Sequence, residues 1–201
     1  MRGRYQAIAS LPMWIVLALW AGPGQAAGNN YDSRLPVPGP EALGRARNEV
    51  HAVFKAEYAK HGEGARLELA EKLYDTALES RQNPSQCFVM LDETIELAVT
   101  IWEVTLALRA TDSVIEIFRV EPVKMRGKTW SRLGAEADTP DQAEEVAEAY
   151  LELAAEAEAD EAYDTAVQAA VWARKYARKG NDRELSAAVE RRVESLQALR
   201  T

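Results

Sequence analysis

The chain has one cysteine and two histidines in 201 residues, and this scarcity excludes several kinds of protein. A single cysteine, Cys87, cannot form an intrachain disulfide, so a disulfide-stapled fold is excluded. His51 and His61 are ten residues apart, which is too far along one helix for both to bind the same metal ion. Neither histidine lies in a metal-binding or catalytic-triad signature. We therefore expect no metal ion, no cofactor and no catalytic residues.

An excess of positive charge is also missing. The chain has 32 Asp and Glu against 24 Lys and Arg, a formal net charge of −8. Nucleic-acid binding depends on neutralising phosphates, so we expect no nucleic-acid partner for so acidic a chain. Because 47% of the residues are apolar, the composition favours a folded chain with a core over a disordered one.

The first 26 residues have the layout of a secretory signal peptide. Arg2 and Arg4 precede an apolar run over 7–21, and small residues follow at Gly24 and Ala26, where a signal peptidase would cut. The run is shorter than the roughly 20 residues that a membrane-spanning helix needs. We predict cleavage after Ala26 and an exported protein, periplasmic or extracellular, with no membrane segment after cleavage. Retention of the segment as an anchor is the alternative.

Two segments follow the predicted signal peptide. Residues 27–39 are polar and contain two prolines, which predicts an extended leader. Residues 40–201 carry helical patterns throughout and are predicted to form a single helical-repeat domain, with sub-halves of about 40–121 and 122–201.

Helix signals dominate this domain. Asn83–Gln86 and Thr139–Gln142 each combine an N-cap residue, a proline at the first helical position and a reciprocal glutamine. Between such signals, apolar residues recur at spacings of three and four. The stripes predict about seven to eight helices, around 40–61, 65–80, 88–98, 106–117, 123–133, 146–153, 163–170 and 185–196. The only strand-like stretch, 118–120, is too short to be expected to pair, so the predicted class is all-α.

An internal echo suggests how the helices are arranged. The pattern of 85–118 resembles that of 161–196, so each half is predicted to consist of stacked antiparallel helical hairpins, a tetratricopeptide-like (TPR-like) solenoid. The strict 34-residue signature of that repeat is missing. Such a stack buries the apolar stripe of every helix. The residues expected to be buried are Phe54, Leu73, Cys87, Phe88, Leu91, Ile95, Ile117, Tyr150 and Val167.

Several spaced motifs carry a family resemblance. They are LPVP at 35–38, EALGRARNEVHAVFKAEYAK at 41–60, LAEKLYDTAL at 69–78, ALRATDSVIEIFRVE at 107–121 and YDTAVQAAVWARKYARKGND at 163–182. Together they resemble a helical domain of unknown function found in exported planctomycete proteins. The resemblance implies the fold and export, and it supplies no catalytic residues. Relatives carry Gly-Asp before the fourth helix, where this chain has Trp102-Glu103, so we expect a continuous or kinked helix there.

Charges are segregated near the C-terminus. Acidic residues are frequent over 141–164, and basic residues cluster over 174–183. We interpret the acidic run as a solvated helix face, with calcium or a cationic partner as the alternatives. The basic cluster suits a helix C-terminus and should lie opposite the acids of the preceding antiparallel helix, with Glu145 near Arg174. A site for an anionic glycan or nucleic acid is the alternative for this cluster.

Two function classes remain open. The sequence favours a non-catalytic protein-interaction or scaffold module that binds another exported protein, because no converging catalytic groups are recognisable. A subunit or cryptic carboxylate-based hydrolase acting on exported or cell-envelope polymers is the alternative. The candidate interaction surface consists of aromatic residues outside the clear apolar stripes, since tryptophan and tyrosine are enriched at binding hot spots. Its members are Trp102, Trp130, Trp172 and Tyr176.

Overall fold

The computed structural model describes residues 33–199, and their fold is all-α, as predicted. The predicted signal peptide, its cleavage site and the first residues of the predicted leader lie outside the described residues. The nine helices of the described part are α1 (Pro40–Val53), α2 (Lys55–Tyr58), α3 (Glu63–Glu79), α4 (Pro84–Thr100), α5 (Val104–Ile117), α6 (Pro122–Glu136), α7 (Pro140–Ala159), α8 (Tyr163–Gly180) and α9 (Arg183–Leu199). Among them, no helix is both long and apolar enough to cross a membrane.

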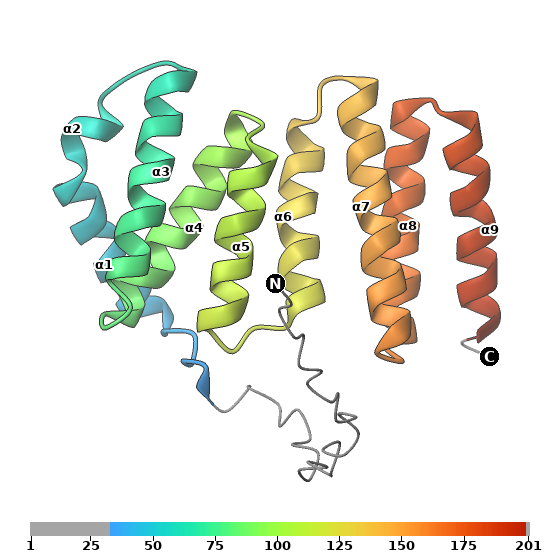
Figure 1. The fold of residues 1–201 in the computed structure, drawn as a ribbon, viewed down its shortest axis with the longest axis horizontal. Helices are drawn as coiled ribbons and strands as arrows, with labels where there is room; N and C mark the ends of the chain where they lie inside the picture. The colour runs from blue at the N-terminus through green and yellow to red at the C-terminus, as the bar shows by residue number, and fades with distance from the viewer. Residues whose placement is uncertain (1–32, 200–201) are drawn as a thin grey trace, which may run out of the picture. The chain divides into compact units, whose positions relative to one another are not determined.

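Helices that are consecutive in the chain stand side by side (Figure 1). From α3 onward each helix packs against the next one, and α4 also contacts α1 and α6. The predicted start signals act as expected: the Asn83 side chain accepts a hydrogen bond from the Gln86 N–H, and Thr139 and Gln142 form a reciprocal capping box. The polar sequence marks therefore fix where α4 and α7 begin.

The first predicted helix, 40–61, is interrupted at Phe54. There the backbone leaves helical geometry (φ −95°, ψ 19°) and separates α1 from α2. Helix α1 packs on α4 and α2 packs on α3, so the chain has to change direction between them. Phe54 is buried at this bend, as its position on the apolar stripe predicts.

The connection between α4 and α5 is a tight turn, so the prediction of a continuous or kinked helix was wrong. Trp102 adopts the left-handed conformation (φ 57°), and the Glu103 N–H donates to the Ala98 carbonyl at 2.8 Å. The same arrangement recurs between α7 and α8, where Glu161 has φ 58° and the Ala162 N–H donates to the Ala157 carbonyl at 2.8 Å. Both are Schellman-type helix ends formed without glycine.

The strand-like stretch at 118–120 does pair, against the prediction. Leu35 and Phe118 form an isolated parallel bridge. The Leu35 N–H donates to the Ile117 carbonyl and the Arg119 N–H donates to the Leu35 carbonyl, each at 2.8 Å. Residue 35 of the predicted leader is therefore attached to the end of α5, because one extended residue on each side is enough to exchange two hydrogen bonds.

Helices α7 and α8 form the predicted antiparallel hairpin, packed through alanines. Ala143, Ala147, Ala154, Ala166, Ala170 and Ala177 have no exposed surface. The ion pairs recorded for the basic cluster among the described residues do not, however, run across this hairpin. Arg174 and Arg178 instead pair with Glu190 of α9, at 3.5 and 2.7 Å. The basic cluster thus joins α8 to α9.

Most of the residues expected to be buried are buried. Phe54, Leu73, Cys87, Leu91, Ile95, Ile117, Tyr150 and Val167 are each at most 9% exposed. Phe88 is the exception, since it is only partly buried. Its ring lies at the edge of the core, where it makes an edge-on contact with Phe118 at 5.0 Å between centroids.

Candidate functional site

A groove of about 400 Å³ lies along the N-terminal halves of α6 and α8. Its lining residues come from three helices: Val123, Lys124, Gly127, Lys128 and Ser131 of α6, Tyr150 and Leu153 of α7, and Asp164, Thr165, Gln168, Ala169 and Trp172 of α8. Helix α7 packs against both α6 and α8 and so provides the floor. The volume lies within the roughly 300–1,000 Å³ of typical ligand pockets.

The groove closes where α6 and α8 meet at Gly134 and Tyr176. A Cβ atom at position 134 would lie 2.3 Å from Tyr176 Cζ, so only glycine lets the ring lie this close to the α6 backbone. One turn earlier, Ser131 and Trp172 already line opposite walls of the open groove. The two helices therefore diverge from the Gly134–Tyr176 contact toward their N-termini.

Three aromatic rings are stacked at the closed end. Tyr150 and Tyr176 are nearly parallel (5°) with centroids 5.9 Å apart, and Trp172 lies 6.2 Å from Tyr150 and 6.4 Å from Tyr176. The Lys175 ammonium lies 4.7 Å from the Trp172 ring centroid and 5.1 Å from that of Tyr176. Such cation–π contacts hold a lysine at the aromatic surface while its charge stays in water.

Tyr150 is fixed as part of the floor. Its hydroxyl donates to the Gly127 carbonyl of α6 at 2.9 Å. Burial, with a smaller contribution from the neighbouring Tyr176, raises the pKa of Tyr150 to about 12. The phenol, neutral at physiological pH like any tyrosine, therefore keeps its proton to a higher pH than usual.

The structure brings together two of the four aromatic residues predicted to form an interaction surface. Trp172 is partly buried and lines the groove, and Tyr176 is buried at its closed end. Trp130 is buried and borders a separate cavity of about 250 Å³ between α5, α6 and α7. Trp102 is partly buried at the α4–α5 turn and is not among the groove residues.

Sequence reasoning missed the lysines of the α6 wall. Lys124 and Lys128 are four residues apart, which places them on one face of α6 on either side of Gly127. That spacing was visible in the sequence as a signal. The sequence could not show that this face of α6 borders a groove, because the distance between α6 and α8 depends on the contact of Gly134 with Tyr176.

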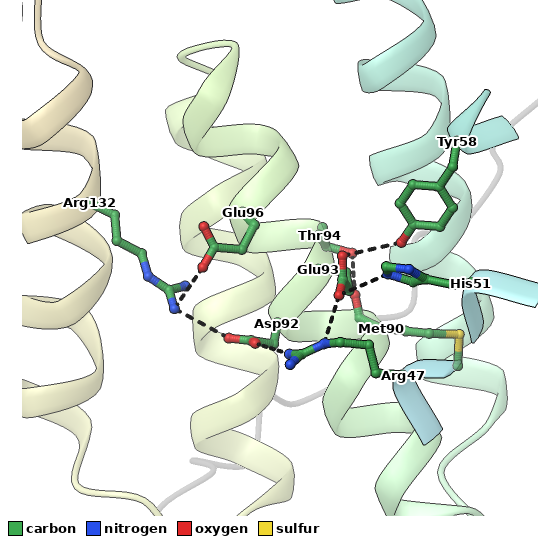
Figure 2. A network of polar contacts seen from close by, with 9 residues as sticks. All are labelled: Arg47, His51, Tyr58, Met90, Asp92, Glu93, Thr94, Glu96 and Arg132. Atoms are coloured by element: carbon green, nitrogen blue, oxygen red, sulfur yellow. Dashed lines mark hydrogen bonds and ion pairs between the residues drawn. The ribbon is translucent and has the colours of Figure 1, made fainter. Parts of the chain in front are cut away.

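A second polar constellation connects α1, α2, α4 and α6 (Figure 2). Glu93 of α4 accepts hydrogen bonds from Arg47 Nε (2.9 Å) and the Tyr58 hydroxyl (3.3 Å), and His51 Nε2 lies 3.2 Å from the same carboxylate. Burial, and then the Glu93 charge, raise the pKa of Tyr58, so this hydroxyl remains a donor.

The network continues across α4 toward α6. Asp92 pairs with Arg47 at 3.0 Å on one side and with Arg132 at 3.6 Å on the other, and Arg132 also pairs with Glu96 at 2.9 Å (Figure 2). Each carboxylate is therefore bound by at least one arginine. A pair of carboxylates that acts as acid and base needs environments that separate their pKa values. Here all three carboxylates are held in ion pairs by Arg47 or Arg132 of neighbouring helices, and we interpret the network as a bridge between helices.

Neither constellation is an evident metal centre. Among residues 33–199, no group of three or more His, Cys, Asp and Glu side chains is placed to hold a metal ion. The groove contains one carboxylate, Asp164, among its lining residues.

No family model, no curated protein and no solved structure matches this chain. The resemblance to the planctomycete helical domain therefore stays a prediction, and the function has to be inferred from the groove itself.

Proposed function

We propose that the chain is a non-catalytic protein-interaction module that binds a segment of another exported protein in the groove between α6 and α8. Export itself rests on the predicted signal peptide. The observation that carries the proposal is the apolar part of the groove's lining, Val123, Tyr150, Leu153 and Trp172, between two helices that approach each other closely at Gly134 and Tyr176.

The lining suits an apolar side chain better than a reacting substrate. Most of the groove's lining surface is apolar, and it also includes polar groups such as Ser131, Thr165 and Gln168. This arrangement is typical of sites in which a few polar groups orient a buried apolar anchor. Burying one Leu or Phe side chain contributes about 1.5–3 kcal/mol, which supports weak, reversible binding by a single anchor.

Catalysis receives less support. Acid–base hydrolysis needs two carboxylates that face each other across a cleft, and the groove's lining residues include one carboxylate, Asp164. The carboxylates of the second constellation, Asp92, Glu93 and Glu96, are bound by Arg47 and Arg132. Turnover of a cell-envelope polymer by the purified protein, abolished by Glu93→Gln, would favour the hydrolase instead.

The binding proposal can be tested with neutral peptides. The probes are Ac-GSSFSSG-NH2 and the same peptide with alanine in place of phenylalanine, titrated into ¹⁵N-labelled protein. We expect the phenylalanine peptide to shift amide signals of 123–131 and 164–172, and the alanine peptide to shift them far less, because only phenylalanine fills the apolar floor.

Two tryptophan variants provide the matched control. Trp172→Ala removes a wall of the groove and should weaken binding of the phenylalanine peptide about tenfold or more. Trp102→Ala removes an equally large, partly buried side chain outside the groove and should leave binding unchanged. Equal affinity of both variants, or shifts confined to other helices, would contradict the proposal.

A further inference from the structure

We infer that the segment bound in the groove is acidic, with carboxylates beside its apolar anchor. This inference rests on the proposed function and adds the chemistry of the partner. It is carried by two lysines of α6 that line the groove and one lysine of α8 that lies over its aromatic rings, in a chain whose formal net charge is −8.

The strongest of these observations concerns Lys128. It is exposed, it lines the groove, and within residues 33–199 it forms no ion pair. Lys124 lies one turn earlier on the same face of α6, where it pairs with Glu121, the N-cap residue of that helix. The α6 wall therefore presents two ammonium groups, one of them without a carboxylate of its own.

Lys175 extends the positive charge to the closed end of the groove. Its ammonium lies over the rings of Trp172 and Tyr176, and within the described part of the chain it forms no ion pair. A cation held at an aromatic surface can meet a carboxylate while an apolar group contacts the rings. An acidic residue next to an aromatic or aliphatic anchor satisfies both features at once.

Within the described residues the neighbouring arginines, unlike Lys128 and Lys175, form ion pairs with carboxylates of other helices. Arg174 and Arg178 are paired with Glu190, and Arg126 donates to both Asp112 and Glu156. The guanidinium groups of Arg126, Arg174 and Arg178 thus join helices to one another. The lysines are the cations left for a partner, since lysine is a flexible point charge that can follow a mobile carboxylate.

The expected gain in affinity for an acidic segment is modest, because these lysines are exposed to solvent. Each solvent-exposed ion pair changes affinity by a factor of roughly 1.4–5, and salt screens it over a Debye length of about 8–10 Å. Two or three such pairs should together strengthen binding about tenfold at low ionic strength. The gain should fall as salt is added.

Four peptides separate charge from anchor: Ac-GEEFEEG-NH2, Ac-GQQFQQG-NH2, Ac-GKKFKKG-NH2 and Ac-GEEAEEG-NH2. Titrated into the full protein at 20 mM and at 300 mM salt, the first should bind about tenfold more tightly than the second at low salt, and the third most weakly. Lys128→Glu should remove most of the preference of the first over the second. Lys55→Glu makes the same change of charge at an exposed position of α2, outside the groove, and should leave the preference intact.

The outcomes distinguish the inference from the proposed function. If the glutamate and glutamine peptides with phenylalanine bind equally, or if Lys128→Glu and Lys55→Glu act alike, the acidic partner is refuted while the groove still binds an anchor. If the glutamate peptide with alanine binds as tightly as the one with phenylalanine, the apolar groove itself is refuted. Trigalacturonic acid tests an anionic glycan, and tighter, Trp172-dependent binding of this probe would overturn the peptide partner.

Discussion

Gly134→Ala should destabilise the protein although alanine is the better helix former. In a helix interior the exchange by itself stabilises by about 1 kcal/mol, because glycine loses more backbone entropy on folding. At position 134 the added methyl group would meet Tyr176, with Cζ at 2.3 Å and the hydroxyl oxygen at 2.4 Å. Overpacking of this kind costs roughly 1–3 kcal/mol, since the ring or the helix has to move. The net change is a loss of about 0–2 kcal/mol.

Gly127→Ala is the matched control in the same helix. A methyl group there would have its nearest neighbour, Leu153 Cδ1, at 3.9 Å, which is an ordinary contact. Without a clash, the propensity gain should remain, and the free energy of unfolding should rise by about 0.5–1 kcal/mol. Urea unfolding followed by far-UV circular dichroism measures both variants, with an unchanged m-value as the check that the comparison is valid.

The comparison refutes the reasoning if the variants behave alike. Equal stabilisation by Gly127→Ala and Gly134→Ala would mean that Tyr176 does not lie against α6 as described. A further variant locates the cause. In a Tyr176→Ala background the clash is absent, so Gly134→Ala should become stabilising by up to about 1 kcal/mol. A persistent loss there would assign the cost to something other than the ring.

Three further predictions concern the network, a tyrosine and the thiol. Asp92→Asn should lower the free energy of unfolding by about 1–3 kcal/mol, because Arg47 and Arg132 both lose a charged partner. The control is Glu68→Gln in the Lys60–Glu68 pair, where the Glu68 side chain is 74% exposed; it should change the free energy of unfolding by less than about 0.5 kcal/mol. Between pH 10 and 12 the unfolded state releases the Tyr150 proton while the folded state, with a pKa of about 12, retains it; stability should therefore fall with rising pH, and less steeply in Tyr150→Phe. Cys87 has no exposed surface and burial raises the pKa of its thiol, so a bulky disulfide reagent should label it only when urea unfolds the protein; rapid labelling of the native state would contradict its burial.

Local signals were sufficient for much of the fold. The capping residues at Asn83 and Thr139 and the apolar stripes act within a few residues, so the sequence pattern alone locates α4, α7 and the class of the fold. The turn at Trp102 could not be found in this way, because tryptophan carries no preference for a left-handed conformation. The turn is stabilised by the hydrogen bond from the Glu103 N–H to the Ala98 carbonyl and by the packing of α5 on α4.

The candidate site was only partly predictable for a related reason. Trp172 could be selected as an aromatic residue beside a basic cluster, and it does line the groove. Trp130, selected as an aromatic residue outside the clear apolar stripes, faces the other side of α6 and is buried. Whether a half-apolar helix face meets protein or solvent depends on the distance to its neighbour. That distance is a property of long-range packing and not of the local pattern.

Helices α6 and α8, the walls of the groove, are both fixed by contacts with α7, and this affects how a partner could bind. Helix α8 is fixed to α7 by close packing of alanines such as Ala166 and Ala170, and α6 is fixed by the Tyr150 hydrogen bond to the Gly127 carbonyl and by Arg126 pairing with Glu156 of α7. These contacts lie beneath or beside the groove. An entering side chain would therefore displace water without first separating the two walls. Binding to a preformed site avoids the free-energy cost of opening it, so even a single anchor with a few charged neighbours can be retained.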